Sequence, residues 1–163
     1  MDYLYFQLYD KTIMNLCLID TNGQPEHSQG LILPFYKKAD IIALIYDITN
    51  RDSFELCENY FKEKIKDNCI KETKIILLGN KNDEEEYRKV STEEGYKFAL
   101  ENNYIFMETS CKKNENVYEV FENAIIEAHL IQKTEEEKKT PNDKILKFGE
   151  KKLNNKNNNC III

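Results

Sequence analysis

Apolar and polar positions alternate along this chain in blocks that predict strands separated by helices. Residues 2–10 are rich in aromatic side chains and residues 13–19 are mostly apolar, so both segments are predicted to be strands. Because only a short turn separates them, we expect an antiparallel hairpin. Continuous apolar runs at 40–47 and 74–79 predict two further strands that are buried on both faces.

Helical spacing of apolar residues appears between these strands. Residues 53–68 carry large apolar side chains at intervals that predict an amphipathic helix, with Thr49 or Asn50 as its cap. The run Ser91-Thr92-Glu93-Glu94 is a capping-box pattern, which predicts a helix that starts there and ends at about Asn102.

The last predicted elements complete a single α/β domain. Residues 104–108 predict a short strand, and apolar positions from 117 to 133 predict a long amphipathic helix. This alternation predicts a domain over residues 1–133, with parallel strand pairing after the hairpin and helices on both faces of the sheet. Residues 134–163 have few large apolar groups and a run of Asn and Lys, so we expect a disordered, linker-like tail.

Charge and cysteine usage narrow the classes of function. The 163-residue chain has a net charge of -6, but residues 138–163 hold seven lysines against two acidic residues. The acidic body argues against nucleic-acid binding, and the basic tail favours binding to an anionic surface. The 5 cysteines form no C-x-x-C pair, which argues against a zinc site and favours a reducing compartment. We find neither a secretory signal nor a run long enough to span a membrane.

Polar loops follow three of the predicted strands at their carboxyl ends, at 20–24, 80–83 and 109–112. In an open α/β sheet, ligands bind just beyond these strand ends. The carboxylate of Asp83 can accept two parallel N–H bonds, such as guanine offers, and the stem of Lys81 can lie flat on a ring. The alternative is an ordinary turn, since Asn and Asp are common turn residues.

Two of these loops resemble the base-binding loops of the small GTPases of the Ras superfamily. Asn80-Lys81-Asn82-Asp83 is similar to the family's N-K-x-D loop, and Glu108-Thr109-Ser110-Cys111-Lys112 is similar to its E-T-S-A-K loop. The runs 35–39, 45–49 and 90–95 look like the Rab subfamily. The resemblance covers most of residues 2–132, and it implies a P-loop-NTPase-like small GTPase sheet.

The resemblance also implies a guanine site. Six residues would form it: Asn80, Lys81, Asp83, Ser110, Cys111 and Lys112. Asp83 would bind the base edge, Asn80 would tie the two loops together, and the stem of Lys81 would cover the ring. Cys111 stands where the family has Ala, and its backbone N–H would face the guanine carbonyl. Ser110 and Lys112 would support that loop.

The loop at 20–24 would serve the phosphates. By the same resemblance, Asp20 would hold Mg²⁺ through water, and the N–H of Gly23 would meet the γ-phosphate. Gln24 would be catalytic by orienting the attacking water, as its counterpart does in Ras-type hydrolysis. Pro25 departs from the family pattern beside Gln24 and restricts the backbone there, which predicts slow hydrolysis.

A second departure from the family pattern concerns the loop that binds the phosphates. The pattern G-x-x-x-x-G-K-[ST] does not occur in this sequence. The resemblance implies that the N-terminal P-loop and switch I portion, with the first strand and helix, is missing from this chain, as after a misplaced start codon or a skipped exon. The family's first strand lies inside the sheet, between the strands at 13–19 and 40–47. We therefore expect two rows of unpaired backbone groups there.

The C-terminal residues Cys160-Ile161-Ile162-Ile163 fit the C-a-a-X lipidation pattern, and the last Ile is typical of geranylgeranyl acceptors. One lipid chain plus a basic tail would give the two signals that stable anchoring requires.

Two functions remain open. The first is a Rab-like small GTP-binding protein, a GTP/GDP switch with Mg²⁺ in intracellular vesicle trafficking, monomeric and peripheral on the cytosolic face of a membrane. Its partners would be effectors, exchange factors and prenyl-carrier proteins. It would be a GTPase if the full product has the P-loop, and inactive or very weak as the chain stands. The second is a pseudo-GTPase binding module. A flavodoxin-like or receiver domain is excluded because the two base-binding loops have no role there.

Overall fold

The strands form one parallel sheet that begins with an antiparallel hairpin. The computed structural model describes residues 2–8, 11, 13–21, 33–69, 73–138 and 158–162. Within these residues the sheet has six strands, in the order β1-β2-β6-β3-β4-β5. They are β1 (Asp2–Gln7), β2 (Ile13–Ile19), β3 (Ile41–Asp47), β4 (Lys74–Asn80), β5 (Ile105–Thr109) and β6 (Asn158–Ile162). The β1–β2 hairpin is antiparallel and every other pairing is parallel, as predicted.

Helices connect the strands and match the predicted segments closely. They are α1 (Leu33–Tyr36), α2 (Arg51–Leu56), the π-helix η1 (Cys57–Phe61), α3 (Lys62–Asn68), the 3-10 helix η2 (Asn82–Tyr87), α4 (Thr92–Glu101) and α5 (Val117–Lys138). The predicted helix at 53–68 is confirmed as the run α2-η1-α3. Its cap is Asn50, whose side-chain oxygen accepts the backbone N–H of Asp52. The predicted capping box of Ser91 and Glu94 is present at the start of α4.

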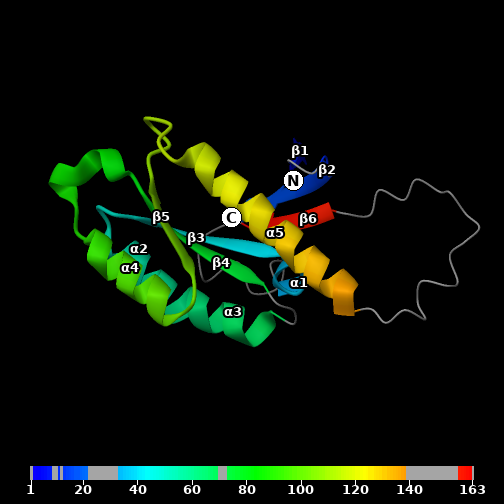
Figure 1. Ribbon diagram of the computed structural model, residues 1–163. Helices are drawn as coiled ribbons and strands as arrows, with labels where there is room; N and C mark the ends of the chain where they lie inside the picture. The colour runs from blue at the N-terminus through cyan, green and yellow to red at the C-terminus, as the bar shows by residue number, and fades with distance from the viewer. Residues whose placement is uncertain are drawn as a thin grey trace, which may run out of the picture.

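Each face of the sheet has its own apolar core. Alternate residues of a strand point to opposite faces, so β3 contributes Ile42 and Leu44 to one core and Ile41 and Ala43 to the other. The first core packs under α2, α3 and α4, and the second packs under α5, which crosses the sheet in Figure 1. Helices on both faces confirm the predicted architecture. None of the helices described here combines the length and apolar character needed to cross a bilayer.

The C-terminal region differs from the prediction in two places. Helix α5 continues to Lys138, past the boundary expected at 133. Residues 158–162 were predicted to be disordered, yet they form β6, between β2 and β3. The position predicted to leave two rows of unpaired backbone groups is therefore filled. The physical reason is that the apolar, β-branched end of the tail suits a buried parallel strand and pairs those groups.

Candidate functional site

Adjacent parallel strands bring the two predicted base-binding loops together. Asn80 at the end of β4 lies in register with Thr109 at the end of β5. Beyond Asn80 the chain turns sharply, because Lys81 adopts a left-handed conformation with φ 68° before η2 begins. Both loops therefore emerge side by side at the carboxyl edge of the sheet, where α/β proteins bind ligands.

Hydrogen bonds join these loops through Asp83 and Asn80. The Ser110 hydroxyl donates to Oδ1 of Asp83 over 2.5 Å, and Nζ of Lys112 lies 3.6 Å from Oδ2. Oδ1 of Asn80 accepts from the Thr109 hydroxyl (3.3 Å) and from the backbone N–H of Cys111 (3.4 Å). The hydrogen bond from Ser110 lowers the pKa of Asp83 below its ordinary value, so this carboxyl remains an anion at neutral pH.

A pocket of about 210 Å³ opens between the loops. Its lining residues are Asn80, Lys81, Asp83, Glu84, Cys111 and Lys112. Ser110 is fully buried and lies behind this lining, where it holds Asp83 in place. The walls thus offer two carboxyl groups and an amide group together with two lysine side chains. This combination suits a planar ligand edge with adjacent N–H donors, which is what a purine base such as guanine presents.

Asp47 is a site residue that sequence reasoning missed. It ends β3 in register with Asn80, and its Oδ2 lies 2.7 Å from Nζ of Lys81. Its Oδ1 accepts the backbone N–H and the hydroxyl of Thr49. Partial burial alone would raise the pKa of Asp47, but the hydrogen bonds from Lys81 and Thr49 lower it overall. The available signal was its place at a strand's carboxyl end, beside the Asn80 loop.

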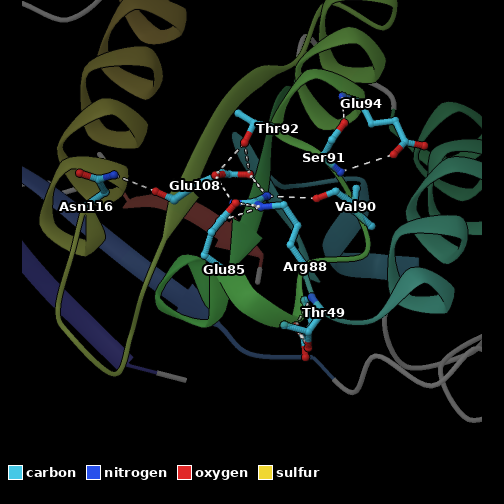
Figure 2. Close-up of polar contacts among 10 residues, drawn as sticks. Thr49, Glu85, Arg88, Val90, Ser91, Thr92, Glu94, Glu108 and Asn116 are labelled. Carbon is cyan, nitrogen blue, oxygen red and sulfur yellow. Dashed lines mark hydrogen bonds and ion pairs between the residues drawn. The ribbon is translucent and has the colours of Figure 1, made fainter.

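Arg88 and Glu108 belong to a network of polar contacts, which Figure 2 shows. Arg88 follows η2 and Glu108 lies in β5, and the two side chains form a bidentate ion pair. Arg88 also contacts Glu85 and donates to the carbonyl of Val90, while the amide of Asn116 donates to the carbonyl of Glu108. The pKa of Arg88 is raised, mainly by the hydrogen bonds to Glu108 and then by those to Glu85. This network fixes the loop that follows Asp83 against the strand that leads to Ser110.

Asp20 is the one predicted phosphate residue that the structure describes, and it does not line this pocket. Asp20 is described, and it is exposed just beyond the end of β2. Gly23 and Gln24 lie outside the described residues, as does the side chain of Cys160, whose backbone lies in β6. Among the described residues, no group of three or more His, Cys, Asp or Glu could hold a metal. The residues that line the pocket between the loops fit the edge of a base.

The parallel strands and the two loops at their carboxyl ends are typical of α/β proteins that bind a ligand at that edge of the sheet. The sequence profile of the Ras family matches residues 5–130. This chain therefore belongs to the Ras family, and its relatives place it among the Rab-like members, as the sequence predicted.

Several curated relatives are similar to this chain over most of its domain. The Ras-related protein SEC4 of Candida albicans is 41% identical over 102 residues, which cover 63% of this chain and 48% of that protein. The Ras-related protein Rab-17 of Homo sapiens is 36% identical over 126 residues, covering 77% and 58%. The Ras-related protein Rab-11B of Dictyostelium discoideum is 38% identical over 114 residues, covering 70% and 51%. The chain spans about half the length of these relatives.

Proposed function

We propose that this chain is a Rab-like small GTP-binding protein that recognises guanine through Asp83 and acts as a GTP/GDP switch in intracellular vesicle trafficking. The observation that supports it best is the 2.5 Å hydrogen bond from Ser110 to Asp83, which joins the two base-binding loops around one pocket. Asp83 would accept the two N–H groups of the guanine edge, and Lys81, held by Asp47, would lie over the ring.

Phosphate and metal binding form the second half of the proposal. Asp20 would hold Mg²⁺ through water, Gly23 would meet the γ-phosphate and Gln24 would orient the attacking water. The sequence contains no G-x-x-x-x-G-K-[ST] pattern, so the 163-residue chain itself would bind nucleotide weakly and hydrolyse it very slowly.

Membrane attachment and partners complete the proposal. A geranylgeranyl group on Cys160 and the lysine-rich tail would hold the monomer on the cytosolic face of an intracellular membrane. Effectors, exchange factors and prenyl-carrier proteins would be its partners, and nucleic acid would not.

Base discrimination tests this function. The purified chain is titrated with GDP, IDP and ADP at millimolar concentration, and binding is followed by the NMR shifts of the amides of Lys81 and Cys111. IDP keeps N1–H but lacks the 2-amino group, so it should bind on the order of tenfold more weakly than GDP. ADP should bind more weakly still. Equal shifts with GDP and ADP would contradict guanine recognition.

A pseudo-GTPase binding module is the second candidate. The absence of the P-loop pattern from this sequence favours it. Single-turnover hydrolysis of GTP with and without Mg²⁺ separates the two functions. If the protein is a GTP/GDP switch, a full product that contains the P-loop should hydrolyse GTP in an Mg²⁺-dependent manner. A pseudo-GTPase should hydrolyse no GTP with or without Mg²⁺.

A further inference from the structure

The carboxylate of Asp47 is held at both of its oxygens. Its Oδ1 accepts the backbone N–H of Thr49 over 2.8 Å and the hydroxyl of Thr49 over 2.7 Å. Its Oδ2 lies 2.7 Å from Nζ of Lys81. The backbone N–H of Asp47 donates to Oγ of Ser53, and Asp47 itself ends β3 opposite Asn80 in β4. The acceptor for Lys81 is therefore a fixed part of the sheet.

Lys81 is held at both ends of its side chain. Its backbone adopts the left-handed conformation that begins the turn after β4, and its ammonium group reaches the end of β3. Lys81 lines the pocket between the loops, whereas Asp47 does not. Lys112, the other lysine of this pocket, is held less closely, since it is 74% exposed and its Nζ lies 3.6 Å from Oδ2 of Asp83. Asp47 would therefore act on a ligand through Lys81.

A lysine side chain that is already fixed binds a flat ring at a lower entropic cost than a mobile one. A mobile lysine loses rotamer freedom when a ligand immobilises it, and this loss weakens binding. In Lys81 part of that freedom is already lost in the folded protein, because the ion pair with Asp47 holds its end. The hydrogen bond to Asp47 also raises the pKa of Lys81 above its ordinary value.

We propose that Asp47 and Thr49 are positioning residues for the base: they hold the side chain of Lys81 along the pocket wall, where its stem meets the face of the ring. This role rests on the proposed nucleotide binding, and it assigns different tasks to two carboxylates. Asp83 reads the edge of the base, which differs between guanine and other purines. Asp47 acts through the face of the ring, which all purines share, so it sets the affinity but not the choice of base.

The alternative is that Asp47 serves only the turn at the end of β3. Asp47→Asn separates the two uses, because the amide oxygen still accepts from Thr49 while an N–H donor replaces Oδ2 opposite the ammonium group. The parent and this variant are titrated with GDP, IDP and ADP, and binding is followed by the NMR shift of the Cys111 amide. The affinity for all three nucleotides should fall on the order of fivefold, with the ratio between GDP and IDP unchanged.

Two further variants sharpen this titration. Asp67→Asn removes an exposed carboxylate of α3 and should leave all three affinities unchanged. Thr49→Val removes the hydroxyl contact to Asp47 but keeps the backbone N–H, so it should weaken all three nucleotides about twofold. A loss of affinity confined to GDP would mean that Asp47 acts on the edge of the base, and it would overturn the proposal.

A double-mutant cycle separates positioning from a purely structural role. Lys81→Met keeps an unbranched apolar stem but removes the ammonium group. In that background Asp47→Asn should have no further effect on nucleotide affinity, because the carboxylate has no ammonium group left to hold. If Asp47→Asn lowers the affinity by the same factor in both backgrounds, its role is structural and the proposal is wrong.

Acetylation of lysines tests the contact without any nucleotide. In trace labelling with acetic anhydride at about pH 8, Lys81 should react on the order of fivefold more slowly than Lys97, whose Nζ lies 4.0 Å from Glu101 in an exposed pair. Asp47→Asn should remove this difference, and Asp67→Asn should keep it. Equal reactivity of Lys81 and Lys97 in the parent would show that Asp47 does not hold Lys81.

This proposal and the proposed guanine recognition fail in different ways. If the parent binds GDP and ADP equally, guanine recognition is wrong, and a common loss of affinity in Asp47→Asn still supports the positioning of Lys81. If the parent prefers GDP but Asp47→Asn binds all three nucleotides as tightly as the parent does, guanine recognition stands and the positioning role is wrong.

Discussion

Arg88 holds Glu108 through two parallel N–H···O bonds, Nη1 to Oε1 at 2.7 Å and Nη2 to Oε2 at 3.0 Å. The side chains are only 13% and 15% exposed, so water screens this pair little. The pair connects the residues after η2 to β5, and thereby sets the spacing between the loop of Asp83 and the loop of Ser110. We therefore expect the shape of the pocket between the two loops to depend on an ion pair that does not line it.

Removal of this arginine should therefore damage both stability and the pocket. Arg88→Ala leaves Glu108 as an uncompensated, mostly buried charge, and the free energy of unfolding should fall by about 3 kcal/mol in urea titrations. GDP binding should weaken as well. Lys97→Ala is the control, because Lys97 and Glu101 form an exposed pair at 4.0 Å, whose loss should cost less than about 0.5 kcal/mol. Equal effects of the two variants would contradict the bracing role.

Asp83→Asn should change which base is preferred. The carboxylate accepts two N–H bonds, whereas the amide accepts one and donates one. Xanthine differs from guanine by a carbonyl in place of the 2-amino group, so the amide matches it and xanthosine diphosphate should bind better than GDP. The ratio of the two affinities, measured by NMR titration, reports the change. Glu84→Gln is the matched control, since Glu84 lines the same pocket and its variant should keep the guanine preference.

Most of the fold followed from local patterns. Apolar periodicity indicated the hairpin, the buried strands and the long helix, and the Ser91–Glu94 capping box marked the start of α4 correctly. These signals are reliable because each depends on residues that are close in sequence. The resemblance to the small GTPases also implied that Asn80 ties the two loops together, and the structure places these loops side by side.

Strand β6 and the bracing residues were not predictable in this way. The composition of residues 134–163 is that of a disordered segment, and Cys160–Ile162 become a strand only through partners more than a hundred residues away. Asp47 contacts Lys81 because β3 and β4 pair in one particular register. Arg88 lies outside any helix or strand, so no periodic signal indicated that it reaches Glu108.

Asp47 should make stability depend on pH in acid. The pKa of Asp47 in the folded state is lower than its ordinary value of 3.8. Its contribution to the free energy of unfolding is therefore complete above pH 3.8, and it is lost as the pH falls through the lower, folded-state pKa. Asp47→Asn removes the charge that pairs with Lys81 but keeps an acceptor for Thr49. It should cost about 1 kcal/mol at pH 7, and the difference from the parent should shrink below about pH 4.

Urea titrations from pH 2 to pH 7 measure this difference. Asp67→Asn, which removes an exposed carboxylate of α3, controls for the general effect of losing one negative charge. A difference for Asp47→Asn that stays constant down to pH 2 would mean that its charge does not stabilise the fold.

Gly95 allows α4 to approach the sheet, and Gly95→Ala should therefore destabilise the protein. At an exposed helix position this change is worth about 1 kcal/mol of stabilisation. Here the added Cβ would lie 2.7 Å from Cε2 of Phe106 and would press on the hydroxyl of Tyr46. Overpacking of this kind costs about 1–3 kcal/mol, measured as a lower free energy of unfolding in urea.

The hydroxyl of Tyr46 gives this prediction an internal control. That oxygen is buried without a hydrogen-bond partner among the described residues, so Tyr46→Phe alone should be neutral or slightly stabilising. Combined with Gly95→Ala, it removes the contact with Tyr46 and leaves those with Phe106, and the double variant should recover part of the lost stability. The coupling follows because the two residues share one contact. Strict additivity would show that the strain in Gly95→Ala comes from Phe106 alone.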